Sequence, residues 1–281
     1  MKDVLIKTYS INIAGWEFVI SADSDVINRT IEKFILCLSN TKKSDCSKMF
    51  NIYISYRENT LNQEQDSRRY TVEREGSVFT IRHSDFKAMY NFDDCSGVLE
   101  NYRQDTVSVD AYLRFAISYL CLIDGGVLIH SAGILTNDGG IVFPGPSMSG
   151  KTTLCNMLYD RYLLLGEELS IVLPLKDDSG YKVYGTPFLG SSSRMSEYGG
   201  KKLKGIIFHC KSNDFYLRKI DYKDALFRLL ETVIIYVDTK DIAEIAVKNS
   251  GNLLKKVRTF EMGFPLDDDW IDDFDTEVRN L

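Results

Sequence analysis

Residues 145–152 read Gly-Pro-Ser-Met-Ser-Gly-Lys-Thr, and they constrain the fold more than any other part of the chain. They fit the pattern G-x-x-x-x-G-K-[ST], in which glycines let successive backbone N–H groups point inward at the start of a helix. An apolar stretch at residues 140–144 predicts a strand before the pattern, and a helix is expected from residue 151 to about 159. This order of strand, loop and helix predicts an anion site for the phosphates of a nucleoside triphosphate. The alternative is a glycine-rich turn followed by a surface lysine.

Within this phosphate loop, residues 145–152, each specified position of the pattern has a chemical task. Lys151 supplies a point charge to the β- and γ-phosphates, and Thr152 supplies a hydroxyl to a magnesium ion. The backbone N–H groups and the positive end of the following helix attract the phosphate oxygens. The residues expected to bind the nucleotide are Gly145, Pro146, Ser147, Met148, Ser149, Gly150, Lys151, Thr152 and Thr153.

A hairpin is expected in front of the phosphate loop. Residues 127–135 are strand-like and carry His130, and the tight-turn sequence at residues 137–140 places this strand antiparallel to the one that leads into the loop. His130 would then orient an acceptor or a phosphate oxygen, the alternative being a satisfied histidine at a strand edge. His83 and His209 have no such context, and we expect both to be structural.

A pair of acids follows the loop helix. Residues 163–168 form a short apolar run that ends in Glu167 and Glu168, so the run can be a strand that delivers two carboxylates to the phosphate site. Phosphoryl transfer needs a held metal ion and benefits from a base on the acceptor hydroxyl, and two adjacent carboxylates can divide those tasks. The alternative is a solvated loop after a strand.

Together these features resemble the catalytic domain of the HPr kinase/phosphorylase family, and they look still more like the shorter HPr-kinase-related proteins found with peptide-modification gene clusters. Residues 128–169 carry most of the resemblance. It implies an α/β fold with a mixed sheet, of the phosphoenolpyruvate-carboxykinase-like type. We expect this phosphate-loop catalytic domain at residues 106–281, preceded by a smaller α+β region at residues 1–105.

The resemblance also implies roles for the matching positions. The family's histidine matches His130, its lysine and Ser/Thr match Lys151 and Thr152, and its paired aspartates match Glu167 and Glu168. Glu167 would be the general base, and Glu168 would bind magnesium together with Thr152. The acids here are glutamates, one methylene longer, and the segment before them is slightly shorter. A counterpart of the segment that HPr kinases use for dephosphorylation is not evident, which favours a kinase-only activity.

Basic residues further along the chain are candidates for contacts with phosphate. Arg194, Lys201 and Lys202 follow in a stretch rich in glycine and serine, which has the composition of a flexible active-site flap. They could neutralise a transferred phosphate or grip an acidic peptide. The alternative is an ordinary polar surface loop.

The leading expectation is therefore an ATP-dependent kinase that phosphorylates a hydroxyl, most simply a serine or threonine of a peptide or small protein. Its cofactors would be ATP and Mg²⁺, and its catalytic residues Glu167, His130, Lys151 and Arg194. One alternative is a kinase for a small molecule such as an amino acid or a sugar. Another is a nucleotide-binding module without catalysis, suggested by the glutamates and by an acidic tail. A carboxykinase reaction is disfavoured, because ligands for a second metal are not evident.

Composition limits the classes of binding partner and the cellular compartment that are expected for this chain. The formal net charge of -6 argues against a general nucleic-acid binder, which needs a basic face. No apolar run approaches the ~20 residues of a membrane span. The six cysteines form no C-x-x-C pair and the start lacks a signal peptide, so a cytoplasmic protein with free thiols is expected. The resemblance implies a homo-oligomer, although the sequence identifies no subunit interface.

Periodicity predicts the remaining elements. The acidic tail at residues 267–277 contains Trp270 and Phe274, which could dock a partner or pack on their own domain. Strands are expected at residues 51–56, 70–74, 78–82, 170–175, 181–184 and 203–208, with a hairpin joining the second and third. Helices are expected at residues 24–38, 107–122 and 224–237, and one or two more at 238–260, interrupted at residues 250–251.

Overall fold

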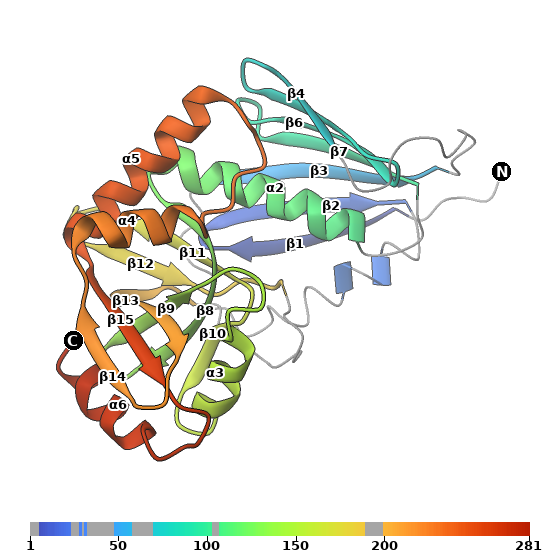
Figure 1. Ribbon diagram of the computed structural model, residues 1–281. Helices are drawn as coiled ribbons and strands as arrows, with labels where there is room; N and C mark the ends of the chain where they lie inside the picture. The colour runs from blue at the N-terminus through green and yellow to red at the C-terminus, as the bar shows by residue number, and fades with distance from the viewer. Residues whose placement is uncertain are drawn as a thin grey trace. The chain divides into compact units, whose positions relative to one another are not determined.

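The computed structural model describes residues 6–23, 28–29, 31–32, 48–57, 70–102, 107–188 and 199–281. Over these residues the chain has a mixed α/β structure with two mixed sheets (Figure 1). It divides into two compact units, Met1–Ala116 and Ile117–Leu281. We had expected a boundary at residues 105–106. The division instead falls within helix α2, Val107–Ile123, a helix predicted correctly from its apolar sequence.

The first unit contains a seven-stranded sheet in the order β1-β2-β3-β7-β6-β5-β4. β3 is parallel to both β2 and β7, and the other neighbours are antiparallel. The predicted strands and the β4–β5 hairpin are confirmed. The strands are β1 (Lys7–Ile13), β2 (Trp16–Ala22), β3 (Lys48–Tyr56), β4 (Thr71–Glu75), β5 (Val78–Arg82), β6 (Phe86–Asn91) and β7 (Ser96–Asn101).

The core of the first unit follows from alternation along its strands. In β2 every second side chain, Trp16, Phe18 and Ile20, is buried, as expected for a strand with one face in a core. The ring of Tyr90 on β6 stacks on that of Tyr112 on α2, with centroids 4.1 Å apart. Most of the helix expected at residues 24–38 lies outside the described residues. The four of its residues that are described have helical backbone.

The second unit contains an eight-stranded sheet in the order β10-β8-β11-β12-β13-β15-β14, with β9 pairing both β8 and β13. β9 and β15 both run parallel to β13, and the other pairs are antiparallel. The strands are β8 (Val127–Thr136), β9 (Gly139–Pro144), β10 (Leu163–Gly166), β11 (Leu169–Pro174), β12 (Tyr181–Tyr184), β13 (Lys201–Lys211), β14 (Tyr216–Lys219) and β15 (Arg258–Phe264). The helices after α2 are α3 (Lys151–Leu158), α4 (Tyr222–Leu230), α5 (Lys240–Lys256) and α6 (Ile271–Arg279).

Two of the predicted helices differ from the structure. The helix expected at residues 224–237 ends at Leu230, and Val233 instead forms a bridge with Ile129 of β8. The region 238–260 holds one uninterrupted helix, α5, and then the start of strand β15, which we had not predicted. Gly251 does not break α5, because it is buried: a Cβ there would lie 2.8 Å from the hydroxyl of Tyr222. Packing has overridden the helix-breaking tendency of Ser-Gly.

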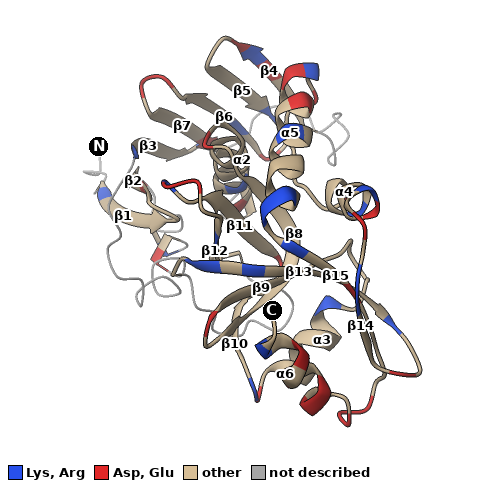
Figure 2. Cartoon of the chain, turned by 90° about the vertical axis from the view of Figure 1, so that its left-hand side faces the viewer, with Lys and Arg blue, Asp and Glu red and all other residues tan. Residues whose placement is uncertain are grey.

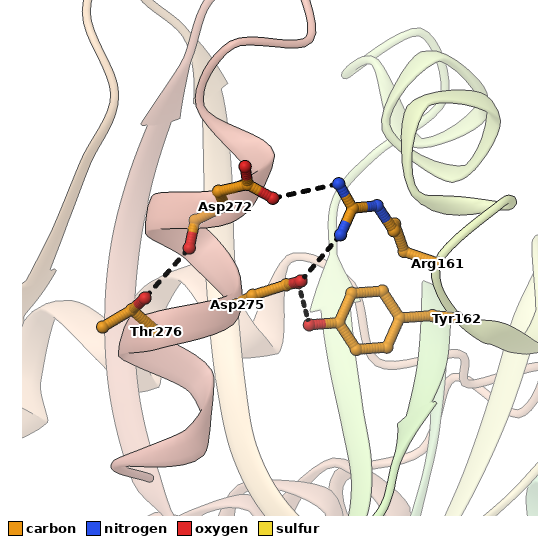
Figure 3. A network of polar contacts seen from close by, with 5 residues as sticks. All are labelled: Arg161, Tyr162, Asp272, Asp275 and Thr276. Atoms are coloured by element: carbon orange, nitrogen blue, oxygen red, sulfur yellow. Dashed lines mark hydrogen bonds and ion pairs between the residues drawn. The ribbon is translucent and has the colours of Figure 1, made fainter.

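The acidic C-terminal segment packs on its own unit through helix α6. Trp270 is 3% exposed and Phe274 is fully buried, and both belong to the core around β9 and α3. Figure 3 shows Arg161 and Tyr162, which follow α3, pointing toward the acids of α6. Arg161 donates to Asp272 at 2.9 Å, and the Tyr162 hydroxyl donates to Asp275. The apolar face of α6 therefore supports the element that follows the phosphate loop. No helix among the described residues is long and apolar enough to cross a membrane.

Candidate functional site

The hairpin in front of the phosphate loop is present. β8 and β9 pair antiparallel from Ser131 opposite Pro144 to Thr136 opposite Gly139. One residue beyond β9, the backbone N–H of Gly145 donates to the carbonyl oxygen of His130 at 3.1 Å. The start of the loop is therefore fixed beside His130 by main-chain hydrogen bonds.

The phosphate loop wraps around the side chain of Lys151. The Lys151 ammonium donates to the carbonyl oxygens of Gly145 and Pro146, both at 2.8 Å, and the residue is 6% exposed. Burial lowers the pKa of Lys151, while the carboxylate of Glu168 acts in the opposite direction. Gly150 has φ of 102°, in the region that favours glycine, so this pattern position is required by the backbone.

Helix α3 presents an open N-terminus to the loop. Gly150 is its N-cap residue and no side chain caps it, and the helix begins with the bond from Leu154 N–H to the Gly150 carbonyl. The first N–H groups of any α-helix have no acceptor within the helix, and they attract anions together with the helix dipole. The hydroxyl side chain of Thr152, in this first turn, is exposed.

The acid pair is held by the same strand that carries His130. β10 and β11 both pair antiparallel with β8, and the register shifts by one residue between Leu164 and Gly166. The Ser131 N–H donates to the Glu168 carbonyl at 3.2 Å. In a flat strand two successive side chains point to opposite faces, whereas a bulge re-aims them. Here the chain bends after the register shift, and both glutamates line one cavity.

This cavity has a volume of about 340 Å³ and collects most of the predicted site residues. Gly145, Pro146 and Ser149 belong to the loop but do not line the cavity. Glu167 is 6% exposed, while Glu168 and His130 are half-buried. The lining consists of His130, Ser147, Met148, Gly150, Lys151, Thr152, Thr153, Glu167, Glu168 and Lys211.

Two residues near the loop were not predicted as site residues. Lys211, the last residue of β13, lines the cavity. His209, which we expected to be structural, lies against the loop with its Nε2 3.3 Å from the hydroxyl of Ser149. Burial, reinforced by the positive charge of Lys151, lowers the pKa of His209 to about 4. Neither residue belongs to a local motif, and only the pairing of β13 with β9 brings them to the loop.

The three basic residues that we expected in one flexible flap do not lie together in a described loop. Arg194 lies outside the described residues. Lys201 and Lys202 open strand β13 rather than lying in a loop, and Lys202 pairs with Lys182 of β12. At ~3.3 Å per residue, Lys202 is about 30 Å along the strand from Lys211. Lys201 and Lys202 therefore lie at the opposite end of β13 from the cavity, and neither lines it.

The cavity lining contains the hydroxyl residue Thr152 and two glutamates, which offer the oxygen ligands that Mg²⁺ prefers. No cluster of three or more His, Cys, Asp or Glu side chains occurs in the part of the chain that the structure describes. Magnesium is usually held by one or two carboxylates together with substrate phosphates and water. Thr152 and Glu168, on the cavity wall, fit that requirement.

The sequence matches no protein-family model, and no curated protein matches it. Inferences about function therefore depend on the loop pattern and the geometry of this cavity.

Proposed function

We propose that this protein is an ATP-dependent kinase that transfers the γ-phosphoryl group to a hydroxyl of a peptide or small protein, a serine or threonine in the first instance. One observation carries the proposal: the phosphate loop, His130 and the adjacent carboxylates of Glu167 and Glu168 line the same cavity. A phosphate loop alone would support only nucleotide binding. A buried carboxylate beside it adds a group that can take the proton of the acceptor hydroxyl, from which phosphoryl transfer benefits.

The loop would hold the triphosphate and position its terminal group. The N–H groups at the start of α3 and the ammonium of Lys151 are the donors for the phosphate oxygens. The Lys151 ammonium is already held inside the loop, because it donates hydrogen bonds to the carbonyl oxygens of Gly145 and Pro146. Bound Mg²⁺ would neutralise charge on the β- and γ-phosphates, and Thr152 and Glu168 are the residues that would hold it.

Glu167 would act as the base. The acceptor oxygen forms a bond to the γ-phosphorus, the bond from that phosphorus to the β–γ bridging oxygen breaks, and ADP leaves. The proton of the acceptor hydroxyl passes to Glu167. His130 lies on the same wall and would orient the acceptor or a phosphate oxygen. This assignment is compatible with glutamate in place of the aspartate of the HPr-kinase-like pattern, because both glutamate side chains reach the cavity.

A phosphoenolpyruvate-carboxykinase-like fold is part of the same proposal. Its support is the antiparallel β8–β9 hairpin that leads into the loop, together with the acids that follow α3 and pair back on β8. In the common βαβ arrangement, the strand before the phosphate loop is followed by a crossover to a parallel neighbour.

Phosphate transfer to a pool of serine- and threonine-containing peptides, followed by mass spectrometry, tests the proposal. The wild-type protein with ATP and Mg²⁺ should produce phosphopeptides. Glu167→Gln removes the base but keeps the side-chain size, so transfer should fall by about 10² or more while ATP binding remains. Glu277→Gln, an exposed glutamate on α6, is the matched control and should retain wild-type transfer.

The outcomes separate the alternatives. Transfer to free amino acids or sugars, but to no peptide, would make the protein a small-molecule kinase. If the protein binds ATP but neither transfers its phosphate nor hydrolyses it slowly, it is a non-catalytic nucleotide-binding module. Unchanged transfer by Glu167→Gln would remove this residue from the base role.

A further inference from the structure

A second lysine, Lys211, lies at the phosphate site although it is 60 residues from Lys151 in the sequence. β13 runs parallel to β9, with Ile206 opposite Val142. Five residues beyond this pair, β13 ends at Lys211, while the neighbouring chain has reached Ser147 in the phosphate loop. Parallel strands deliver their carboxyl ends to the same edge of a sheet, where ligands of α/β proteins usually bind. The sheet therefore brings both segments to one cavity.

The side chain of Lys211 lies over the end of the loop. A Cβ atom built on Gly150 would be 3.9 Å from the Lys211 Cε, so the carbon next to the ammonium is close to the residue that precedes α3. Lys211 lines the cavity together with Lys151, Glu167 and Glu168. Figure 2 shows Lys and Arg residues in blue along β13, which carries Lys201, Lys202, Lys204 and Lys211. Of these four, Lys211 lines the cavity.

The two lysines of the cavity differ in their contacts. Lys151 is buried and its ammonium donates to two carbonyl oxygens of the loop. Lys211 is exposed. Its backbone belongs to the ladder with β15, but none of the hydrogen bonds or ion pairs found between described residues involves its side chain. The ammonium on its flexible stem is therefore available to a ligand. A compact charge with three donors adapts to a phosphate oxygen without a fixed fork geometry.

Lys211 also balances the charge of the cavity lining. The charged part of this lining consists of two lysines and two glutamates. Without Lys211 the lining would hold two carboxylates and one ammonium, so Lys211 supplies half of the positive charge that the protein itself contributes. The acids lie where the acceptor and the terminal phosphoryl group must meet if Glu167 is the base. A second cation in that space would bind the terminal phosphate. It would also stabilise the negative charge on the phosphoryl oxygens during transfer.

We propose that Lys211 contacts the terminal phosphate of the bound nucleoside triphosphate, so that the site distinguishes a triphosphate from a diphosphate. This inference rests on the proposed function and names a further catalytic residue for it. Lys151 and the helix amides would bind the phosphates common to both nucleotides, whereas Lys211 would bind the one that is transferred.

Titration calorimetry with Mg-ATP and with Mg-ADP tests the assignment without measuring turnover. Lys211→Met keeps the length of the stem and removes the charge. It should weaken ATP binding by about tenfold or more, the usual worth of a charge-assisted hydrogen bond, and change ADP binding by less than about twofold. Lys211→Arg should restore the preference for ATP. Lys202→Met, on the same strand but far from the cavity, should leave both affinities unchanged.

The possible failures are distinct. Equal weakening of ATP and ADP binding in Lys211→Met, or no weakening of either, would overturn the role of Lys211 while leaving the phosphate loop as the nucleotide site. Failure of the wild-type protein to bind either nucleotide would overturn the proposed function and this inference with it. Unfolding curves of Lys211→Met that match the wild type would show that a loss of ATP binding is not a loss of fold.

Discussion

At the scale of single residues, His209 shows what burial against the phosphate loop does to a titratable group. Its ordinary pKa is about 6.5, and burial together with the charge of Lys151 lowers it to about 4. Between these two values the unfolded chain takes up a proton that the folded protein excludes. The stability due to neutral His209 is therefore complete above about pH 6.5 and is lost as the pH falls toward 4.

Replacing His209 should change the pH dependence of stability. Between pH 7 and pH 5 the wild type should lose roughly 1 to 2 kcal/mol more unfolding free energy than His209→Gln, which has no proton to take up. Urea denaturation at both pH values measures this difference, and His83→Gln in the first unit is the control. Equal losses in the wild type and His209→Gln would mean that His209 is charged like an exposed histidine.

The predicted site residues that line the cavity share one property: they lie within a short segment. Lys151 and Thr152 are specified by a local pattern, and His130, Glu167 and Glu168 lie within about twenty residues of it. Lys211 and His209 were not predicted because no local pattern marks them. They reach the loop through pairing between strands that are far apart in the sequence, and hydrophobic periodicity does not predict which strands pair.

At the scale of elements, helix α6 belongs to the acidic C-terminal segment, whose sequence allowed either a surface for a partner or packing on its own domain. The aromatic residues of this segment are part of the core of the second unit. Phe274 contacts Trp270 edge-on, with ring centroids 5.7 Å apart, and is fully buried. The acids of the segment lie mostly on the other side of the helix, and Asp272 and Asp275 bind Arg161. Both expectations for the tail were compatible with its amphipathic sequence. Only the contacts with the core decide between them.

Truncating Phe274 should therefore destabilise the second unit. Phe274→Ala leaves a cavity in a packed core and should reduce the free energy of unfolding by about 3 to 5 kcal/mol. Chemical denaturation followed by circular dichroism measures the change. Glu277→Ala, on the exposed face of the same helix, should alter stability by less than about 0.5 kcal/mol. A similar small effect in Phe274→Ala would mean that α6 is not anchored in the core.

The missed strand β15 has a physical explanation. Residues 258–264, Arg-Thr-Phe-Glu-Met-Gly-Phe, lack the clean alternation of a half-exposed strand, because β15 lies between β13 and β14 and most of it is buried. Its Glu261 is buried in ion pairs with Arg218 and Arg228. A charged residue inside a buried strand suggests an exposed position when the sequence is considered alone. Pairing with distant arginines is what makes burial tolerable.

At the scale of the whole molecule, the mixed α/β class and the elements around the loop were predicted, whereas the order of strands in the sheets was not. The β8–β9 hairpin follows from a two-residue turn sequence. The neighbours of β13, in contrast, are β9, β12 and β15, which come from three separated parts of the chain. Long-range pairing of this kind depends on the packing of a complete unit rather than on local propensity.

The proposed activity requires the phosphate loop to bind a nucleoside triphosphate through its main-chain N–H groups and Lys151. Calorimetric titration of the whole chain with Mg-ATP measures this binding. The wild type should give a saturable heat, and Lys151→Ala should weaken binding by roughly 10- to 100-fold, since it removes a buried charge from the loop. Lys219→Ala, an exposed lysine on β14, should bind like the wild type. Absence of saturable binding in the wild type, or undiminished binding by Lys151→Ala, would contradict the proposal.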